Sequence, residues 1–251
     1  MDKIELDVRD DGVRLLTLRD PQRRNALGEQ MGAELRACVR DLAADADARA
    51  LVITGEGPSF CAGADLPALF GDPDRPVSET RAVLSAYYQT FFSVRDLPFP
   101  TIAAVNGPAV GAGLNLAMAC DLRVAGRAAA FGATFARIGL HPGGGATWFL
   151  TRAMGPGRAL RTLLLGETLD AERAVAWGLA EEGPVDDPVA VALDLAARIA
   201  GLEPGLAEKI KRAVAIAGTG GDLDAVVELE TDAQAASASS PTLQAWVDRF
   251  R

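Results

Sequence analysis

Two glycine-rich segments, each following a short apolar run, carry the clearest chemical signal in the sequence. They are Phe60-Cys-Ala-Gly-Ala-Asp-Leu66 and Asn106-Gly-Pro-Ala-Val-Gly-Ala-Gly-Leu-Asn115. Small residues let a ligand approach the main chain, and a helix N-terminus offers N–H donors without intrahelical partners. One such junction alone would favour a tight packing turn. Two that face one point would form an oxyanion hole, in which losing one donor typically costs about two orders of magnitude in rate.

Other glycine clusters do not match nucleotide or nucleophile motifs. A dinucleotide fingerprint needs G-x-G-x-x-G, but Gly111-Ala-Gly113 is followed at the third glycine position by Leu116. The run Gly143-Gly-Gly145 likewise has Trp148 at the third glycine position. The sequence contains no G-x-x-x-x-G-K loop and no G-x-S-x-G elbow. These absences argue against a nicotinamide site, a P-loop and an α/β-hydrolase nucleophile.

Few side chains near the glycine-rich segments can titrate. His141 is the only histidine, and a lone loop histidine is more often structural or exposed, so a catalytic role for it is the minor alternative. Cys61 is expected to be a small buried apolar residue. Tyr87 and Tyr88 are expected to pack or to cover a pocket. One histidine and three cysteines without C-x-x-C spacing predict no metal site.

Hydrophobic periodicity shows which elements must position these segments. Alternating apolar residues around Asp10-Asp11-Gly12 predict an opening hairpin. Apolar residues then recur at helical spacing from Leu27 to Leu42. Ser78 is a candidate cap of a further helix. Strands are predicted at 51–54, 101–105 and 122–125, and helices at 78–94, 111–119 and 131–140.

The last part of the chain has a different pattern. From about Val189 onward it is mainly helical, and Gly218-Thr-Gly-Gly221 is the clearest break. We therefore predict a strand-rich α/β core over residues 1–188 and a helical, oligomerisation region over residues 189–251. The helices predicted within it are near 189–201, 204–217, 222–238 and 241–250.

Composition excludes several classes of function. The chain has 251 residues, 49% of them hydrophobic, with a formal net charge of −9, so it can bury a sizeable core but suits neither nucleic acid nor anionic lipid. The uncharged run from Thr101 to Met118 is broken by glycine and asparagine, which argues against a membrane span. An odd number of cysteines without a disulfide pattern indicates a reducing compartment. A soluble, cytoplasmic protein is expected.

Taken in order, these segments resemble the crotonase (enoyl-CoA hydratase/isomerase) superfamily. The resemblance implies an α/β fold in the form of a ClpP-like spiral of repeated ββα units, with a C-terminal helical region. It also implies assembly as a homotrimer or a dimer of trimers. The segments that carry the resemblance are residues 21–27 (the CoA segment), 60–66 (first signature), 106–116 with 119–123 (second signature), 131–145 (helix and loop) and 169–179.

The resemblance further implies how the site is built. The backbone N–H groups of Ala64 and Ala112 would form the oxyanion hole, and alanine keeps the donor at the second position, where the family more often has glycine. An acyl-CoA thioester is the implied ligand, with no cofactor beyond its CoA moiety. The residues implied to contact the substrate or CoA are Arg23, Arg24, Ala26, Ala62, Gly63, Asp65, Leu66, Gly111 and Phe135.

Hydration in this family uses two glutamates, and both are replaced in this chain. One glutamate activates water and the other delivers the proton. Their positions correspond to Asn115 and Phe135, and neither side chain can gain or lose a proton near neutral pH. The carboxylate of dienoyl isomerase and dehalogenase relatives would fall near Gly143 and is also absent. Asn115 and, as the minor alternative, His141 are the catalytic side-chain candidates that remain.

Two functional hypotheses stay open. The leading one is an acyl-CoA enzyme that stabilises a thioester enolate or oxyanion, a hydratase-type lyase by resemblance. Its reaction could also be a decarboxylation, a thioester hydrolysis or an isomerisation. The other hypothesis is a catalytically inactive protein that binds acyl-CoA. Retention of Ala64 and of Gly111-Ala112-Gly113 argues against a purely structural subunit.

Overall fold

The computed structural model describes residues 2–250, in which strands alternate with helices up to residue 185 and helices alone follow. The strands are β1 (Ile4–Val8), β2 (Val13–Leu18), β3 (Ala50–Gly55), β4 (Thr101–Val105), β5 (Pro108–Val110), β6 (Leu122–Gly126), β7 (Ala130–Gly132), β8 (Thr168–Asp170) and β9 (Glu182–Val185). The helices are α1 (Glu29–Ala43), α2 (Leu66–Phe70), α3 (Val77–Arg95), α4 (Ala112–Ala119), α5 (Ala146–Met154), α6 (Pro156–Leu165), α7 (Ala171–Trp177), α8 (Pro188–Ala200), α9 (Leu206–Gly218), α10 (Leu223–Ser237) and α11 (Pro241–Asp248), with short 3-10 helices η1 (Pro21–Arg23) and η2 (Thr134–Ile138).

The strands form two sheets. The main sheet has the order β1-β2-β3-β4-β6-β9, and the second has the order β5-β7-β8. β1 and β2 pair antiparallel, which confirms the opening hairpin, while the remaining neighbours in the main sheet are parallel. Gly12 in the hairpin turn has a φ of +84°, a conformation that glycine adopts without strain.

Two successive turns of the chain each add one strand to the main sheet and one to the second sheet, and a helix follows. β4 enters the main sheet, β5 enters the second sheet, and α4 follows; β6 and β7 repeat the step before η2 and α5. Isolated parallel bridges from Leu27 to Ala64 and from Cys61 to Ala109 extend the second layer to earlier turns. The predicted spiral of ββα units is therefore present.

The central strands of the main sheet, β3 and β4, are buried on both faces. Leu51 and Ile53 of β3 pack with the α1, α3 and α4 side, whereas their neighbour Val52 packs with Ala192 and Ala196 of α8. Adjacent residues of a strand point to opposite faces, so a strand covered on both sides reads as a continuous apolar run. The run Leu51-Val-Ile that predicts this strand therefore reflects burial between two helical layers.

Three local features differ from the sequence prediction. Residues 131–140 do not form one helix: Phe131 lies in β7, and η2 follows as a short 3-10 helix. The helix predicted from Ser78 begins at Val77 with Pro76 as its N-cap, so Ser78 is not the cap. No periodicity signals β5, because a strand of three residues is too short to display one.

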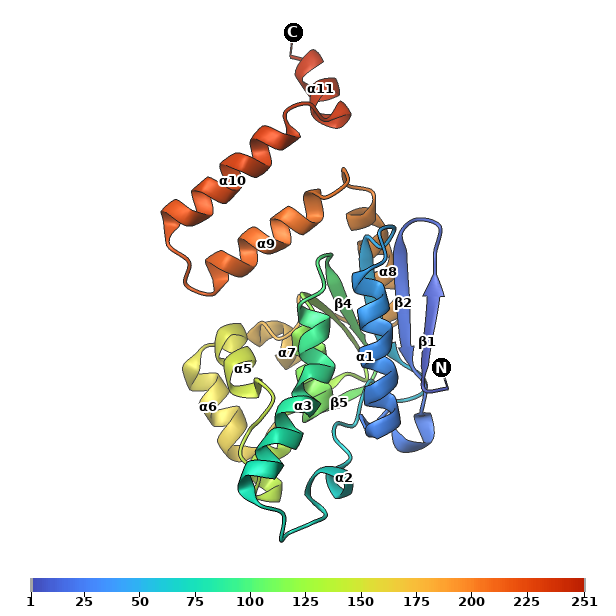
Figure 1. Ribbon diagram of the computed structural model, residues 1–251, viewed down its shortest axis with the longest axis vertical. Helices are drawn as coiled ribbons and strands as arrows, with labels where there is room; N and C mark the ends of the chain where they lie inside the picture. The colour runs from blue at the N-terminus through green and yellow to red at the C-terminus, as the bar shows by residue number, and fades with distance from the viewer. Residues whose placement is uncertain (1, 251) are drawn as a thin grey trace.

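The last three helices extend away from the sheets (Figure 1). In the described chain, α9 and α11 contain no buried residue, and α10 contains only Val226. α8 differs, because it packs on the main sheet although it lies beyond the predicted boundary at residue 188; that boundary stays a prediction. Across residues 2–250, no helix is both long and apolar enough to cross a bilayer.

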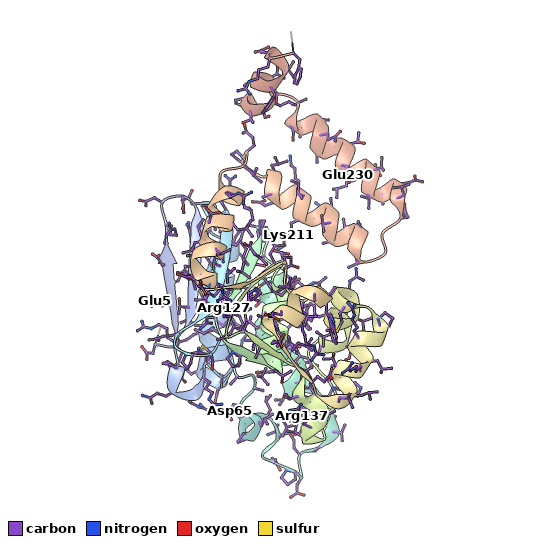
Figure 2. All side chains as sticks on the ribbon, turned by 180° about the vertical axis from the view of Figure 1, so that it is seen from behind. Glu5, Asp65, Arg127, Arg137, Lys211 and Glu230 are labelled. Atoms are coloured by element: carbon purple, nitrogen blue, oxygen red, sulfur yellow. The ribbon has the colours of Figure 1, made fainter. Side chains whose placement is uncertain are left out.

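Lys211 makes polar contacts that hold α9 against the rest of the chain (Figure 2). Its Nζ donates to the Phe99 carbonyl at 3.0 Å and lies 2.8 Å from Oδ2 of Asp121. The same carboxylate oxygen accepts from the backbone N–H and the hydroxyl of Thr101. The middle of α9 is therefore held by polar contacts, whereas the last three helices as a whole have little buried surface.

Candidate active site

The two glycine-rich junctions lie side by side because they belong to successive turns of the spiral. The backbone N–H of Cys61 donates to the Pro108 carbonyl at 3.1 Å, and the N–H of Val110 donates back to the Cys61 carbonyl at 3.0 Å. These two bonds align residues 61–64 with β5. Only Gly111 separates β5 from Ala112, the first residue of α4, so the folded chain brings Ala64 near Ala112.

Two glycines allow this close approach. A Cβ on Gly63, whose φ is +100°, would lie 2.4 Å from the Val110 carbonyl oxygen and 3.4 Å from the Ala112 nitrogen. A Cβ on Gly113 would lie 2.1 Å from the Cys61 carbonyl oxygen. Both obstacles are main-chain atoms that cannot move aside, so a side chain at either position would separate the junctions.

The N–H groups of Ala64 and Ala112 are free to bind a ligand. Neither has a hydrogen-bond partner among residues 2–250. Ala112 is the first residue of α4, after Gly111 with a φ of 55°, so its N–H belongs to the unpaired first turn and to the positive end of the helix dipole. Both N–H groups are therefore available to a hydrogen-bond acceptor from outside the protein.

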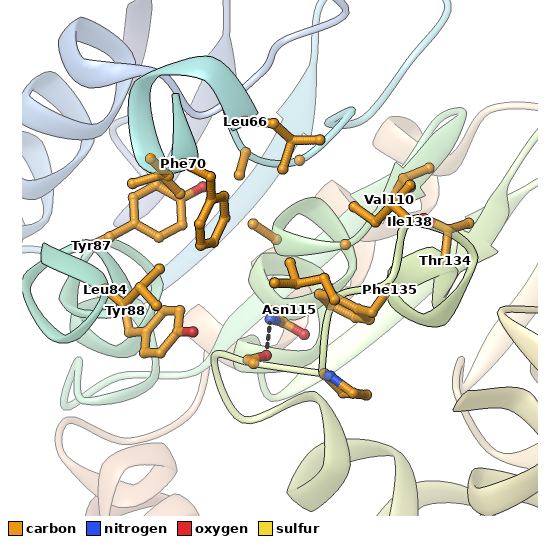
Figure 3. A pocket seen from close by; sticks show the side chains of 18 of the residues that line it. Leu66, Phe70, Leu84, Tyr87, Tyr88, Val110, Asn115, Thr134, Phe135 and Ile138 are labelled. Carbon is orange, nitrogen blue, oxygen red and sulfur yellow. Dashed lines mark hydrogen bonds between the residues drawn. The ribbon is translucent and has the colours of Figure 1, made fainter. Parts of the chain in front are cut away.

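A largely apolar cavity of about 310 Å³ opens beside these donors (Figure 3). We call it the acyl cavity. Tyr87 and Phe70 lie at one end, and Val110, Ile138 and Thr134 lie at the other (Figure 3). Nine of the residues singled out in the sequence line it: Ala62, Gly63, Ala64, Leu66, Gly111, Ala112, Asn115, Phe135 and His141.

No aspartate or glutamate is among the described residues that line the acyl cavity. Asn115 is 2% exposed, and its Nδ2 donates to the Gly143 carbonyl at 2.9 Å (Figure 3). This bond fixes the amide orientation, because only the nitrogen can donate to a carbonyl. The Oδ1 of Asn115 is left buried without a partner in the part of the chain that the structure describes. Phe135, which is 8% exposed, contributes an aromatic ring to the wall of the cavity.

His141 lies at the rim of the cavity rather than inside it. Its side chain is exposed, and its Nδ1 lies 2.7 Å from the carbonyl oxygen of Pro142. Neither Asn115 nor either oxyanion donor hydrogen-bonds to it in the described chain. The structure therefore brings His141 to the site without joining it to the groups that could act on a thioester.

The aromatic wall of the cavity comes from one face of α3. Leu84, Tyr87, Tyr88 and Phe91 line it at positions i, i+3, i+4 and i+7. Burial raises the pKa of Tyr87 far above its ordinary range, so its phenol stays protonated. Of these four residues only the two tyrosines are predicted from the sequence as a wall or lid, although the helical spacing is a signal that identifies Leu84 and Phe91 as well.

The proposed CoA segment runs beside the first junction. The N–H of Leu27 donates to the Gly63 carbonyl at 2.7 Å, and the N–H of Ala62 donates to the Arg24 carbonyl at 2.9 Å. These bonds place Arg23, Arg24 and Ala26 next to the cavity, although none of the three lines it. The arginine side chains are exposed at its outer side.

Asp65 has a local structural role. Its Oδ2 accepts from Nη2 of Arg23 at 2.7 Å, and its Oδ1 caps α2 by accepting from the Ala68 N–H at 3.4 Å. The hydrogen bond from Arg23 lowers the pKa of the Asp65 carboxyl. The pair therefore holds the Arg23 guanidinium at the outer side of the first junction.

Cys61 offers no nucleophile. The side chain is fully buried, and burial raises the pKa of its thiol to about 12. A neutral thiol is a poor nucleophile at physiological pH. The arrangement as a whole therefore supplies two main-chain donors and an apolar cavity, but no side chain that is poised to abstract a proton.

The chain is similar to known proteins over almost its whole length. The sequence profile of the family described as enoyl-CoA hydratase/isomerase matches residues 9–250. The probable enoyl-CoA hydratase EchA14 of Mycobacterium tuberculosis (strain H37Rv) is 47% identical over 244 residues, which cover 94% of this chain and 93% of that protein. The 1,2-epoxyphenylacetyl-CoA isomerase of Escherichia coli (strain K12) is 37% identical over 242 residues, which cover 95% and 92%.

A solved structure extends the similarity to three dimensions. The enoyl-CoA hydratase from Bacillus anthracis superposes with a TM-score of 0.88 at 30% sequence identity, covering 98% of this chain and 96% of that chain. Such a superposition includes both the sheets and the C-terminal helices. It confirms the fold class that the sequence predicts.

Proposed function

The chain belongs to the enoyl-CoA hydratase/isomerase family, and we propose that it binds an acyl-CoA thioester and polarises the thioester carbonyl with the N–H groups of Ala64 and Ala112. One observation carries the proposal. Two main-chain donors without protein partners, from adjacent turns of the spiral, open onto the same apolar cavity.

The proposed chemistry follows from these donors. When the α-carbon of a thioester loses a proton, or when a nucleophile attacks the carbonyl, negative charge develops on the carbonyl oxygen. Fixed N–H groups stabilise that charge more strongly in a cavity that excludes water than they would in solution. Asn115 can orient a water molecule or substrate group through Oδ1 but cannot accept a proton as a carboxylate does.

The reaction that uses this polarised carbonyl is proposed to need no protein carboxylate. An enoyl-CoA hydration, an isomerisation, a decarboxylation and a thioester hydrolysis all pass through an enolate or a tetrahedral oxyanion. The hydratase and isomerase names of the relatives support an enzymatic role. A second candidate, an acyl-CoA-binding protein without turnover, is favoured specifically by the lack of aspartate and glutamate in the described cavity lining.

The CoA moiety is proposed to lie along the outer side of the first junction. Arg23 and Arg24 offer exposed guanidinium groups for its phosphates. Ala62, Asp65 and Leu66 would together lie along the pantetheine and the adenine. No cofactor beyond this CoA moiety is proposed, and we expect neither nucleic acid nor a membrane as a partner, in a cytoplasmic setting.

We further propose a homotrimer or a dimer of trimers. The last three helices leave large apolar side chains exposed, and a second copy of the chain could cover them. Light scattering across a range of concentrations would test the assembly, and a monomer at all concentrations would contradict it. The exposed apolar residues are Ile210, Val214, Leu223, Val227, Leu243 and Trp246.

The decisive experiment is to incubate the protein with a panel of acyl- and enoyl-CoA thioesters, crotonyl-CoA included, and to follow each by mass spectrometry. A water adduct would identify hydration. Release of free CoA would identify hydrolysis, and a thioester product lighter by carbon dioxide would identify decarboxylation. Isomers of equal mass would be separated by chromatography. Tight binding without turnover would identify the second candidate, and failure to bind any thioester would contradict the proposal.

A further inference from the structure

A second cavity lies beside the acyl cavity, between α1, α2 and α3. Its volume is about 330 Å³, and most of its wall is apolar or glycine. We call it the α1–α3 groove. The residues that line it are Leu27, Gly28, Glu29, Gly32, Arg36, Asp65, Ala68, Leu69, Val83, Ala86 and Tyr87.

The groove exists because small residues face one another across two helices. Gly28 and Gly32 are four residues apart at the start of α1, and therefore lie on one face of it. Val83, Ala86 and Tyr87 share the opposing face of α3 at positions i, i+3 and i+4. The helices contact each other elsewhere, and the missing or short side chains of Gly28, Gly32 and Ala86 leave room for a ligand group.

The groove and the acyl cavity are neighbours that share two walls. Leu69 and Tyr87 line both of them. The Tyr87 hydroxyl is buried without a hydrogen-bond partner in the described residues, and the ring makes edge contacts with Tyr88 and Phe91 at centroid distances of 6.2 Å each. Apolar packing alone holds the ring in place, and an alkyl chain can replace such packing without breaking a hydrogen bond.

We propose that the α1–α3 groove receives the distal part of a long acyl chain whose thioester is held at Ala64 and Ala112. The inference rests on the proposed function and adds the substrate class, a long-chain acyl-CoA. The chain would leave the acyl cavity past Leu69 and Tyr87, at the end where Figure 3 shows Tyr87 beside Phe70.

The charged groups of the groove leave an apolar path for such a chain. Asp65 is paired with Arg23 at 2.7 Å, and Nη1 of Arg36 donates to the Thr90 hydroxyl at 2.7 Å. Glu29 is exposed and can stay in water. Burying methylene groups against the remaining wall is favourable by about 0.8 kcal/mol each, which is about a fourfold gain in affinity per group.

The test is to fill the groove from its solvent side without touching the acyl cavity. Ala86 is exposed on α3 and lines only the groove, so Ala86→Trp is the filling variant. Ser85 is equally exposed and lines neither cavity, so Ser85→Trp is the matched control. Ala68→Phe fills the groove from α2 and serves if the first variant fails to fold. Calorimetry would give Kd for butanoyl-CoA and dodecanoyl-CoA.

We expect the unmodified protein to bind dodecanoyl-CoA at least about tenfold more tightly than butanoyl-CoA. Ala86→Trp should remove that gain and leave butanoyl-CoA binding unchanged, while Ser85→Trp should change neither Kd. An Ala86→Trp protein that keeps its preference for the longer chain would overturn the inference, as would an equal loss for both thioesters. Binding of neither thioester by the unmodified protein would overturn the proposed function itself.

Discussion

The two ends of the acyl cavity are built in different ways. At the proposed oxyanion end, the main-chain N–H groups of Ala64 and Ala112 lack protein partners in the described chain, and Gly63 and Gly113 allow the two junctions to approach each other. At the other end, where Tyr87 and Phe70 lie, the wall consists of side chains from α2 and α3. Main-chain donors do not depend on side-chain identity, so a chain with asparagine at position 115 and phenylalanine at position 135 keeps both N–H groups.

The two ends also differ in how firmly the fold holds them. At the proposed oxyanion end, a Cβ on Gly63 or Gly113 would meet main-chain atoms at 2.4 and 2.1 Å. The aromatic end rests on ring packing, and its Tyr87 hydroxyl lacks a partner in the described chain. We therefore expect substitutions to act on thioester chemistry at the first end and on ligand choice and stability at the second.

The largest effect should come from removing one oxyanion donor. Ala112→Pro deletes the N–H, while proline is well tolerated at the first position of a helix. We expect turnover of the best thioester, or affinity if there is no turnover, to fall by about 100-fold. Steady-state kinetics or calorimetry on the purified variant would measure the loss.

The control for this variant is Leu223→Pro. Leu223 is the exposed first residue of α10, far from the cavity, so its substitution should leave the thioester chemistry unchanged. Undiminished activity in a folded Ala112→Pro protein would show that this N–H does not contribute, and would break the contrast between the two ends.

Introducing one carboxylate into the cavity should raise the rate of crotonyl-CoA hydration much less than introducing two. Asn115→Glu alone should add little crotonyl-CoA hydration, because Phe135 still leaves the second proton-transfer position empty. Glutamate also cannot donate to the Gly143 carbonyl, so the free energy of unfolding should fall by about 1–3 kcal/mol. Water addition followed by mass spectrometry, and urea unfolding, would measure the two effects.

Asn115→Gln, which keeps an amide donor, is the control for the stability effect. The double variant Asn115→Glu with Phe135→Glu should hydrate crotonyl-CoA faster than the single variant. Substantial hydratase activity in the single variant would count against a requirement for two carboxylates.

A smaller effect is expected at the aromatic end. Tyr87→Phe removes a buried hydroxyl without a hydrogen-bond partner and keeps the ring, so the free energy of unfolding should stay equal or rise by up to about 1 kcal/mol. Urea denaturation would measure it, with Tyr88→Phe as the matched control. A clear loss of stability in Tyr87→Phe would reveal a partner for the hydroxyl.

The smallest effect should come from His141. Its side chain is exposed at the rim and makes no hydrogen bond to Asn115 or to the oxyanion donors within residues 2–250. We expect His141→Gln to change kcat/KM or Kd by less than about twofold, a difference of under 0.5 kcal/mol. A loss of 100-fold or more in kcat with unchanged KM would instead make His141 the catalytic side chain.

Local signals in the sequence were enough to predict most elements of the core. The run Leu51-Val-Ile predicts β3, and helical spacing from Leu27 to Leu42 predicts α1 to within two residues at its start. These predictions hold because strand burial on two faces and helix burial on one face each leave a periodic pattern. The structure of residues 131–140 escaped prediction because a short strand followed by a 3-10 turn leaves no such pattern.

The sequence by itself determined which chemistry is available and which is missing. Glycine at positions 63 and 113 and the absence of a carboxylate at positions 115 and 135 can be read directly from the residues. Only the tertiary structure decided that the N–H groups of Ala64 and Ala112 open onto one cavity, and that a second groove adjoins it. Convergence of this kind depends on strand pairing between successive turns of the spiral, and such long-range pairing is set by the packing of the whole core.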